Sequence, residues 1–81
     1  MKNNKKRHFQ FPVVIEWVEE SKMYVATVPG LKGAHTQART LDELEENVRE
    51  VIELCVEEAE SRRETDFPTF IGVHQIEVAC K

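Results

Sequence analysis

Acidic side chains are the residues of this sequence with the clearest potential for chemistry. Between Asp42 and Glu60 the only cation is Arg49, so this stretch has a net charge of −8. Its nine carboxylates belong to Asp42, Glu43, Glu45, Glu46, Glu50, Glu53, Glu57, Glu58 and Glu60. A two-metal nuclease needs several carboxylates that converge on a sheet, but only Glu16 and Glu77 lie in stretches with the alternating pattern of strands. The sequence therefore favours a protein that is not an enzyme, with a metal-dependent nuclease kept as an alternative.

Histidines and cysteines are the other side chains that could bind a metal or act as nucleophiles. His8, His35, His74, Cys55 and Cys80 contain no Cys-x-x-Cys or His-x₃-His pair, which are the spacings typical of zinc sites. No serine or cysteine lies in a signature of an activated nucleophile, and there is no glycine-rich phosphate loop. We expect no catalytic residue, no metal and no cofactor.

The acidic stretch is better suited to binding a protein. A negative field attracts a basic partner and raises its association rate. Leu54 falls outside the apolar stripe of the predicted helix, where a leucine ringed by charge can anchor a partner. The candidate partner-binding residues are Glu46, Glu50, Glu53, Leu54 and Glu57. The alternative is a solvated helix face chosen for helix propensity, with Leu54 as an ordinary exposed leucine.

A capping box marks the start of the helix that carries these residues. The Thr40 hydroxyl can accept from the amide of Glu43, whose carboxylate can reach back to the Thr40 amide. Just upstream, Gly30 and Gly33 supply the backbone angles of turns. At 100° per residue, one sector of the helix is apolar and predicts a core-facing stripe. This stripe contains Leu41, Leu44, Val48, Val51, Ile52, Cys55 and Ala59.

Four stretches alternate between apolar and polar residues, as strands do. Residues 9–18 and 23–28 flank a polar connection at 19–22, and residues 34–38 follow as a third strand before the helix. Residues 70–80 alternate again and predict a fourth strand that returns to the sheet.

Length and charge predict one small domain. Of 81 residues, 1–8 form a basic N-terminus that we expect to be disordered, and 9–81 form the domain. A domain of this length buries too small a core to be very stable alone, and two cysteines are too few for a disulfide framework. Association of several copies would bury more apolar surface, so we expect a homo-oligomer, a dimer or a tetramer. The sequence shows no signal peptide and no apolar run long enough for a membrane span, and we expect a soluble, cytoplasmic protein without membrane contact.

The junction of glycine turn, short strand and helix start resembles the HicB-like antitoxin family of type II toxin-antitoxin systems. The resemblance runs from about residue 11 to residue 80 and departs at Ala38 and Arg39, where the family more often has glycine followed by an acidic residue. The matching residues are Val25, Ala26, Val28, Pro29, Leu31, Gly33, Thr36, Thr40, Leu41, Glu43 and Leu44. The resemblance implies an α+β, β-β-β-α-β unit, a small antiparallel sheet covered by one long helix, which is a reduced ribonuclease-H-like fold.

The resemblance also implies a function. It points to an antitoxin that binds and neutralises a small basic mRNA endoribonuclease of the HicA type. An orphan, oligomeric HicB-like domain with another protein or small molecule as its partner would have the same sequence features. Many family members continue into a DNA-binding segment, whereas only Lys81 follows Cys80, so we expect no sequence-specific DNA binding by this chain alone.

Overall fold

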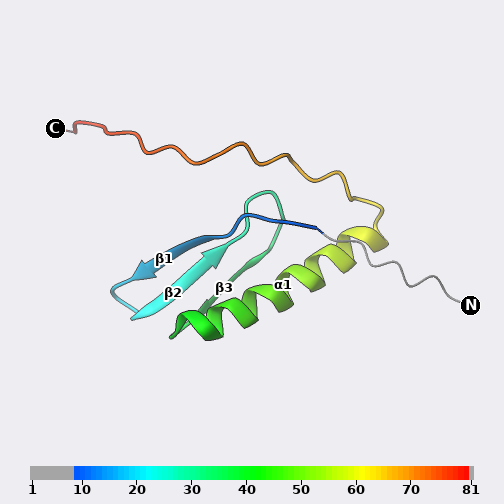
Figure 1. Ribbon diagram of the computed structural model, residues 1–81, viewed down its shortest axis with the longest axis horizontal. Helices are drawn as coiled ribbons and strands as arrows, with labels where there is room; N and C mark the ends of the chain where they lie inside the picture. Colours follow the sequence, from blue (N-terminus) through cyan, green and yellow to red (C-terminus); the bar gives the residue numbers. More distant parts are fainter. Residues whose placement is uncertain (1–8, 81) are drawn as a thin grey trace, which may run out of the picture.

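The computed structural model describes residues 9–80 and consists of three strands followed by one helix (Figure 1). The strands are β1 (Val14–Val18), β2 (Met23–Thr27) and β3 (His35–Ala38), and the helix is α1 (Leu41–Ser61). The α+β class and the order of these four elements are confirmed. The prediction of a disordered basic N-terminus falls on residues 1–8, outside the described part of the chain.

The strands form an antiparallel meander in the order β1-β2-β3. At the β1–β2 turn, Lys22 takes a positive φ of 58° and its amide donates to the Val18 carbonyl at 2.9 Å. The predicted first strand is shortened, because β1 begins at Val14, which pairs with Thr27 at the end of β2. One physical reason is that Pro12 has no amide to donate to a neighbouring strand.

The cap at Thr40 fixes where α1 begins. Its Oγ1 accepts from the Glu43 amide at 3.1 Å, as predicted, a bond whose loss typically costs about 1 kcal/mol. The return bond from the Glu43 carboxylate to the Thr40 amide is not among the hydrogen bonds of residues 9–80. Upstream, Gly30 and Gly33 both take positive φ values, near 80°, which agrees with their predicted role in turns.

The predicted stripe of α1 packs on the sheet. Leu44, Val48 and Ala59 are buried, and Leu44 is only 1 % exposed. Val51, Ile52 and Cys55 are half-buried against the core formed by β2, β3 and the loop between them. Leu41 was wrongly assigned to the stripe, since it is 51 % exposed. In the described part of the chain, no helix is apolar over enough of its length to cross a membrane.

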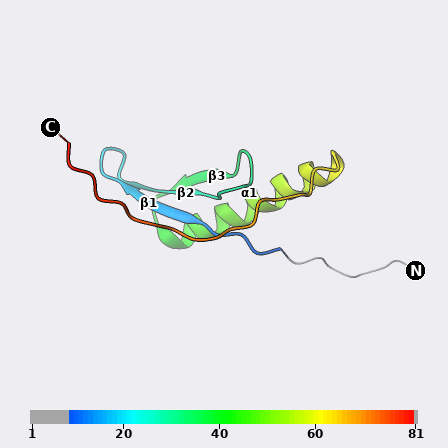
Figure 2. The same ribbon diagram turned by 90° about the horizontal axis from the view of Figure 1, so that it is seen from above.

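The helix covers only part of the sheet. It contacts β3 and β2 but not β1, and its C-terminal half continues past the strands (Figure 2). Because directly paired residues share a face, Ile15 and Trp17 lie on the same side as the buried Ala26 and Ala38. Both β1 side chains remain about half exposed there, so an apolar strip of β1 is left beside the helix.

The predicted fourth strand, residues 70–80, is not formed within this chain, and this part of the predicted β-β-β-α-β unit is corrected. Residues 64–80 contain no strand, and residues 68–80 are all exposed. The segment is fixed only at its start, where Phe67 packs edge-on against Phe9 and Phe11 with ring centroids 5.8 and 5.4 Å apart. The reason is that alternation favours an extended backbone but supplies no partner. In Figure 1 the segment runs alongside the sheet without joining it.

Candidate functional site

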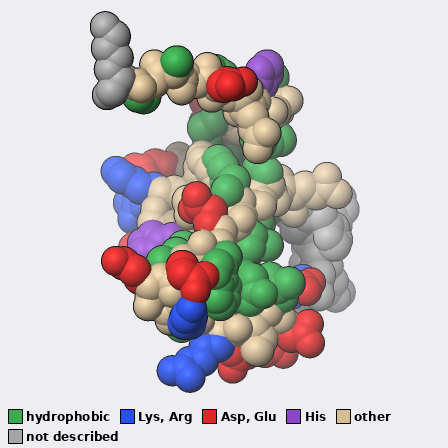
Figure 3. Space-filling view, turned by 90° about the vertical axis from the view of Figure 1, so that its left-hand side faces the viewer, with side chains coloured by type: hydrophobic (Ala, Val, Ile, Leu, Met, Phe, Trp, Pro, Cys, Tyr) green, Lys and Arg blue, Asp and Glu red, His purple; other side chains and the backbone are tan. Residues whose placement is uncertain are grey.

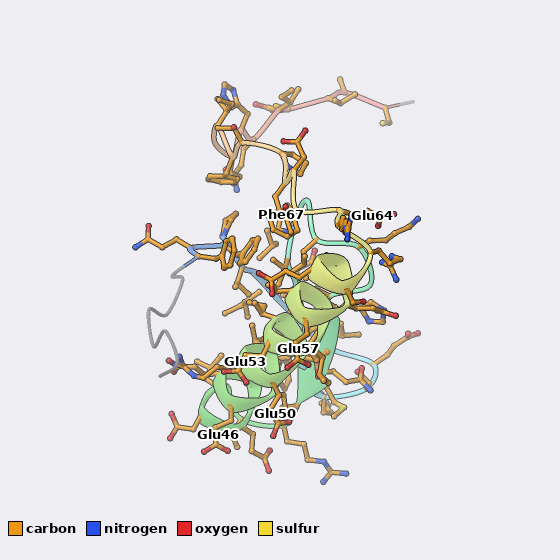
Figure 4. The ribbon with its side chains drawn as sticks, turned by 90° about the vertical axis from the view of Figure 1, so that its right-hand side faces the viewer. Glu46, Glu50, Glu53, Glu57, Glu64 and Phe67 are labelled. Carbon is orange, nitrogen blue, oxygen red and sulfur yellow. The ribbon has the colours of Figure 1, made fainter. Side chains whose placement is uncertain are left out.

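The acidic side of α1 lies opposite its buried stripe. Since Leu44, Val48 and Ala59 face the core, residues about half a turn away must face solvent. All five candidate residues, Glu46, Glu50, Glu53, Leu54 and Glu57, are exposed. Figure 4 shows the four labelled glutamates spaced along one side of the helix. We call these five residues the acidic stripe.

Leu54 is the apolar member of the acidic stripe. Its side chain is 65 % exposed, more than any other large apolar residue of the helix in the described chain. It follows Glu50 by four residues and precedes Glu57 by three, which are neighbouring positions on a helix surface. The arrangement is an apolar side chain with carboxylates close to it, as an interface anchor with a polar rim requires.

The stripe carboxylates form no ion pairs in the described part of the chain. Glu45 pairs with Arg49 at 3.5 Å and Glu58 with Arg62 at 3.3 Å, each between positions i and i+4. In residues 9–80, no ion pair involves Glu46, Glu50, Glu53 or Glu57. The nearby arginines therefore neutralise carboxylates outside the stripe and leave the stripe negative.

This pattern has an energetic cost in the isolated chain. Glu46 and Glu50 are four residues apart, and so are Glu53 and Glu57. Like charges at this spacing on a helix destabilise it by about 0.2–0.5 kcal/mol per pair. A basic partner would relieve this repulsion, so the stripe is better suited to a complex than to the free protein.

A groove that the sequence does not predict lies beside the acidic stripe. It has a volume of about 1230 Å³ and lies between α1 and the segment leading into β1. Phe11, Val13, Ile52 and Val56 supply apolar lining. Of the stripe, the groove includes Glu53 and Glu57 but not Glu46, Glu50 or Leu54. The apolar residues at 9–13 are the sequence feature that could have indicated this groove, but their alternating pattern predicts a strand instead.

The residues weighed for metal binding and catalysis do not form a cluster. In residues 9–80, no group of three or more His, Cys, Asp or Glu side chains is placed to hold a metal ion. Glu16 is exposed in β1, and Glu77 is exposed in the unpaired C-terminal segment. His35 is exposed in β3 and His74 in the same segment as Glu77. His8 lies outside the described residues.

Both cysteines are free thiols. Cys55 is half-buried and packs against the core, as its position in the predicted stripe implies. Cys80 is exposed near the end of the described chain.

Comparison with known proteins identifies the family of this chain. The model of the HicB-like antitoxins of bacterial toxin-antitoxin systems matches residues 11–79. The UPF0150 protein ssr1258 of Synechocystis sp. is 44 % identical over 69 residues, which cover 85 % of this chain and 94 % of that protein. A UPF0150 protein of Archaeoglobus fulgidus is 46 % identical over 69 residues, with the same two coverages. A third, of Thermotoga maritima, is 40 % identical over 68 residues, or 84 % of this chain and 88 % of that protein.

The search of solved structures found no match. The family model extends from the segment before β1, through the sheet and α1, to the end of the C-terminal segment. The relatives match over nearly their whole length. This chain therefore belongs to the HicB-like antitoxin family.

Proposed function

We propose that the chain is an antitoxin that binds and neutralises a small, basic mRNA endoribonuclease of the HicA type, without catalytic activity of its own. Membership in the HicB-like family supports an antitoxin role in general. The observation that supports the specific proposal is the acidic stripe, whose carboxylates form no ion pair in the described chain. The cytoplasm is the proposed location, because mRNA is the toxin's substrate there.

The proposed mechanism is competition for a surface that binds RNA. A protein that binds RNA uses lysine and arginine side chains to neutralise phosphates. The carboxylates of Glu46, Glu50, Glu53 and Glu57 can take the place of those phosphates and block access to the cleavage site. Long-range attraction raises the association rate, and burial of Leu54 in the complex slows dissociation.

We also propose that the antitoxin acts as a homo-oligomer. The support is the uncovered apolar strip of β1, where Ile15 and Trp17 lie on the core side of the sheet beyond the reach of α1. Full burial of a large apolar side chain is worth about 1.5–3 kcal/mol, and because these two side chains are already half buried, covering them gains roughly half of that each.

Co-expression tests the proposed function. A HicA-type toxin encoded beside this chain should arrest growth when induced alone, and this chain should restore growth and co-purify with the toxin. Replacing Leu54 by alanine should weaken the complex about five- to thirtyfold, as loss of an interface anchor does.

The matched control is Leu41→Ala, which truncates the other exposed leucine of α1. Its affinity for the toxin should stay within twofold of the wild type. Absence of both rescue and a complex would refute the antitoxin proposal, whereas equal effects of the two substitutions would refute only the anchor role of Leu54.

A further inference from the structure

The C-terminal segment is extended and rich in apolar residues, and it pairs with no strand of the described chain. We call residues 69–80 the arm, and every residue in it is exposed. Ile71 is 89 % exposed and Ile76 is 81 % exposed, Val73 and Val78 are also largely open to solvent, and Phe70 is about half exposed. Figure 3 shows hydrophobic side chains on the arm, which stands off from the body. Proteins normally pair or cover an apolar strand of this kind, because its free backbone groups promote aggregation.

A matching free edge exists in the sheet. In the described chain, β1 pairs with β2 on one side only, so its other edge has unpaired amides and carbonyls. A groove of about 600 Å³ lies between the start of the arm and the segment leading into β1. Its lining includes Phe11 and Val14 from the segment that leads into β1, and Phe67 and Ile71 from the C-terminal segment. The start of the arm thus lies beside the start of β1, and a groove remains open there.

Strand direction favours a second copy of the chain as the occupant of this groove. The arm runs in the same direction as β1 in both ribbon views (Figures 1 and 2), so pairing within the chain would be parallel. A two-fold axis perpendicular to the sheet reverses the arm of a second copy. That arm would be antiparallel to both β1 and the first arm, matching the rest of the sheet.

We propose that two copies of this chain exchange their arms, so that each arm lies between β1 and the arm of the other copy. The result is one continuous antiparallel sheet in which the two arms pair with each other at the centre and each β1 pairs with the arm of the other copy. Closed two-fold symmetry of this kind is the commonest form of oligomer. The inference does not depend on the proposed toxin.

The chemistry of the arm fits a copy of itself better than a basic partner. Glu77 is the only residue of the arm with a full charge at neutral pH, whereas the negative charge of the chain is concentrated on α1. Eleven extended residues, 70–80, span about 36 Å at about 3.3 Å per residue. This length exceeds that of β1, so one arm can pair along all of β1.

The first test is the mass of the full chain by light scattering. The wild type should have the mass of at least two chains at micromolar concentration. The variant Val73→Pro/Ile76→Pro should lose at least half of that mass, because both neighbours of an exchanged arm need its amides. Thr65→Pro is the matched control: it lies before the arm, outside any helix or strand, and should keep the wild-type mass. A monomeric wild type, or a proline variant with unchanged mass, would overturn the proposal.

The second test identifies the arms as the contact and leaves every backbone amide of the arm in place. Single cysteines are placed one at a time at positions 69–79 in a Cys55→Ala/Cys80→Ser background and oxidised. A two-fold axis perpendicular to the sheet places one arm residue opposite its own copy, so disulfide-linked dimers should form most readily at one position, and cysteine at Glu46 should give none. A dimer that cross-links at no arm position would refute the exchange.

Discussion

Reversal of charge along the acidic stripe is expected to abolish neutralisation of the toxin. Replacing Glu46, Glu50, Glu53 and Glu57 by lysine changes the helix from a net charge of −8 to neutral and places positive groups against a basic surface. The association rate at low salt should fall by about 10- to 1000-fold. The difference between wild type and variant should shrink as salt screens the charges. Titration of the toxin at two ionic strengths measures both effects.

A matched pair of variants separates the position of the charge from its amount. Glu50→Lys/Glu57→Lys and Glu20→Lys/Asp66→Lys change the net charge equally, and all four residues are exposed. Only the first variant should lose affinity, while circular dichroism should show that both retain the helix. Equal affinities for the two folded variants would place the toxin surface elsewhere, such as on the open sheet face or an edge strand.

Truncation of Leu44 is expected to have the largest effect on stability. Leu44 is 1 % exposed and lies at the centre of the core between α1 and the sheet. Leu44→Ala should reduce the free energy of unfolding by about 2–5 kcal/mol through lost burial and the cavity that remains. A domain of this length has a total stability of about 4–12 kcal/mol, so much of it would be lost.

Leu54→Ala is the control for Leu44, because it makes the same chemical change at a side chain that is 65 % exposed. It should alter stability by no more than about 0.5 kcal/mol. Urea unfolding of the two variants under identical conditions measures the difference. Similar losses would show that α1 does not pack on the sheet through the stripe that contains Leu44.

Local sequence signals predict most of the fold. The cap at Thr40 and the apolar period of α1 are properties of a single segment, and the structure reproduces both. The turn at Lys22 and the two strands that it joins, β1 and β2, also lie within one short stretch of sequence. The pairing of residues 70–80 is a different kind of property, because a strand needs an edge to join. Alternation along one chain cannot specify which edge, or whether a second molecule provides it.

The candidate site also contains features that the sequence predicts and one feature that it does not. Helical geometry is sufficient to place Glu46, Glu50, Glu53 and Glu57 on one exposed side of α1. The groove between α1 and the segment before β1 brings Phe9 and Phe11 together with Ile52 and Val56 of the helix. These two helix residues follow the two phenylalanines by about forty positions in the sequence, and no local period indicates that they meet.

If the acidic stripe is the surface that the toxin covers, the complex should shield the carboxylates of the stripe from solvent. Carboxylate footprinting measures this shielding, since a carbodiimide with an amine labels exposed Asp and Glu side chains and mass spectrometry reads each site. Toxin binding should reduce labelling at Glu46, Glu50, Glu53 and Glu57, while Glu20 and Asp66 should be labelled as in the free protein. Unchanged labelling of the stripe in a saturated complex would show that the toxin binds elsewhere.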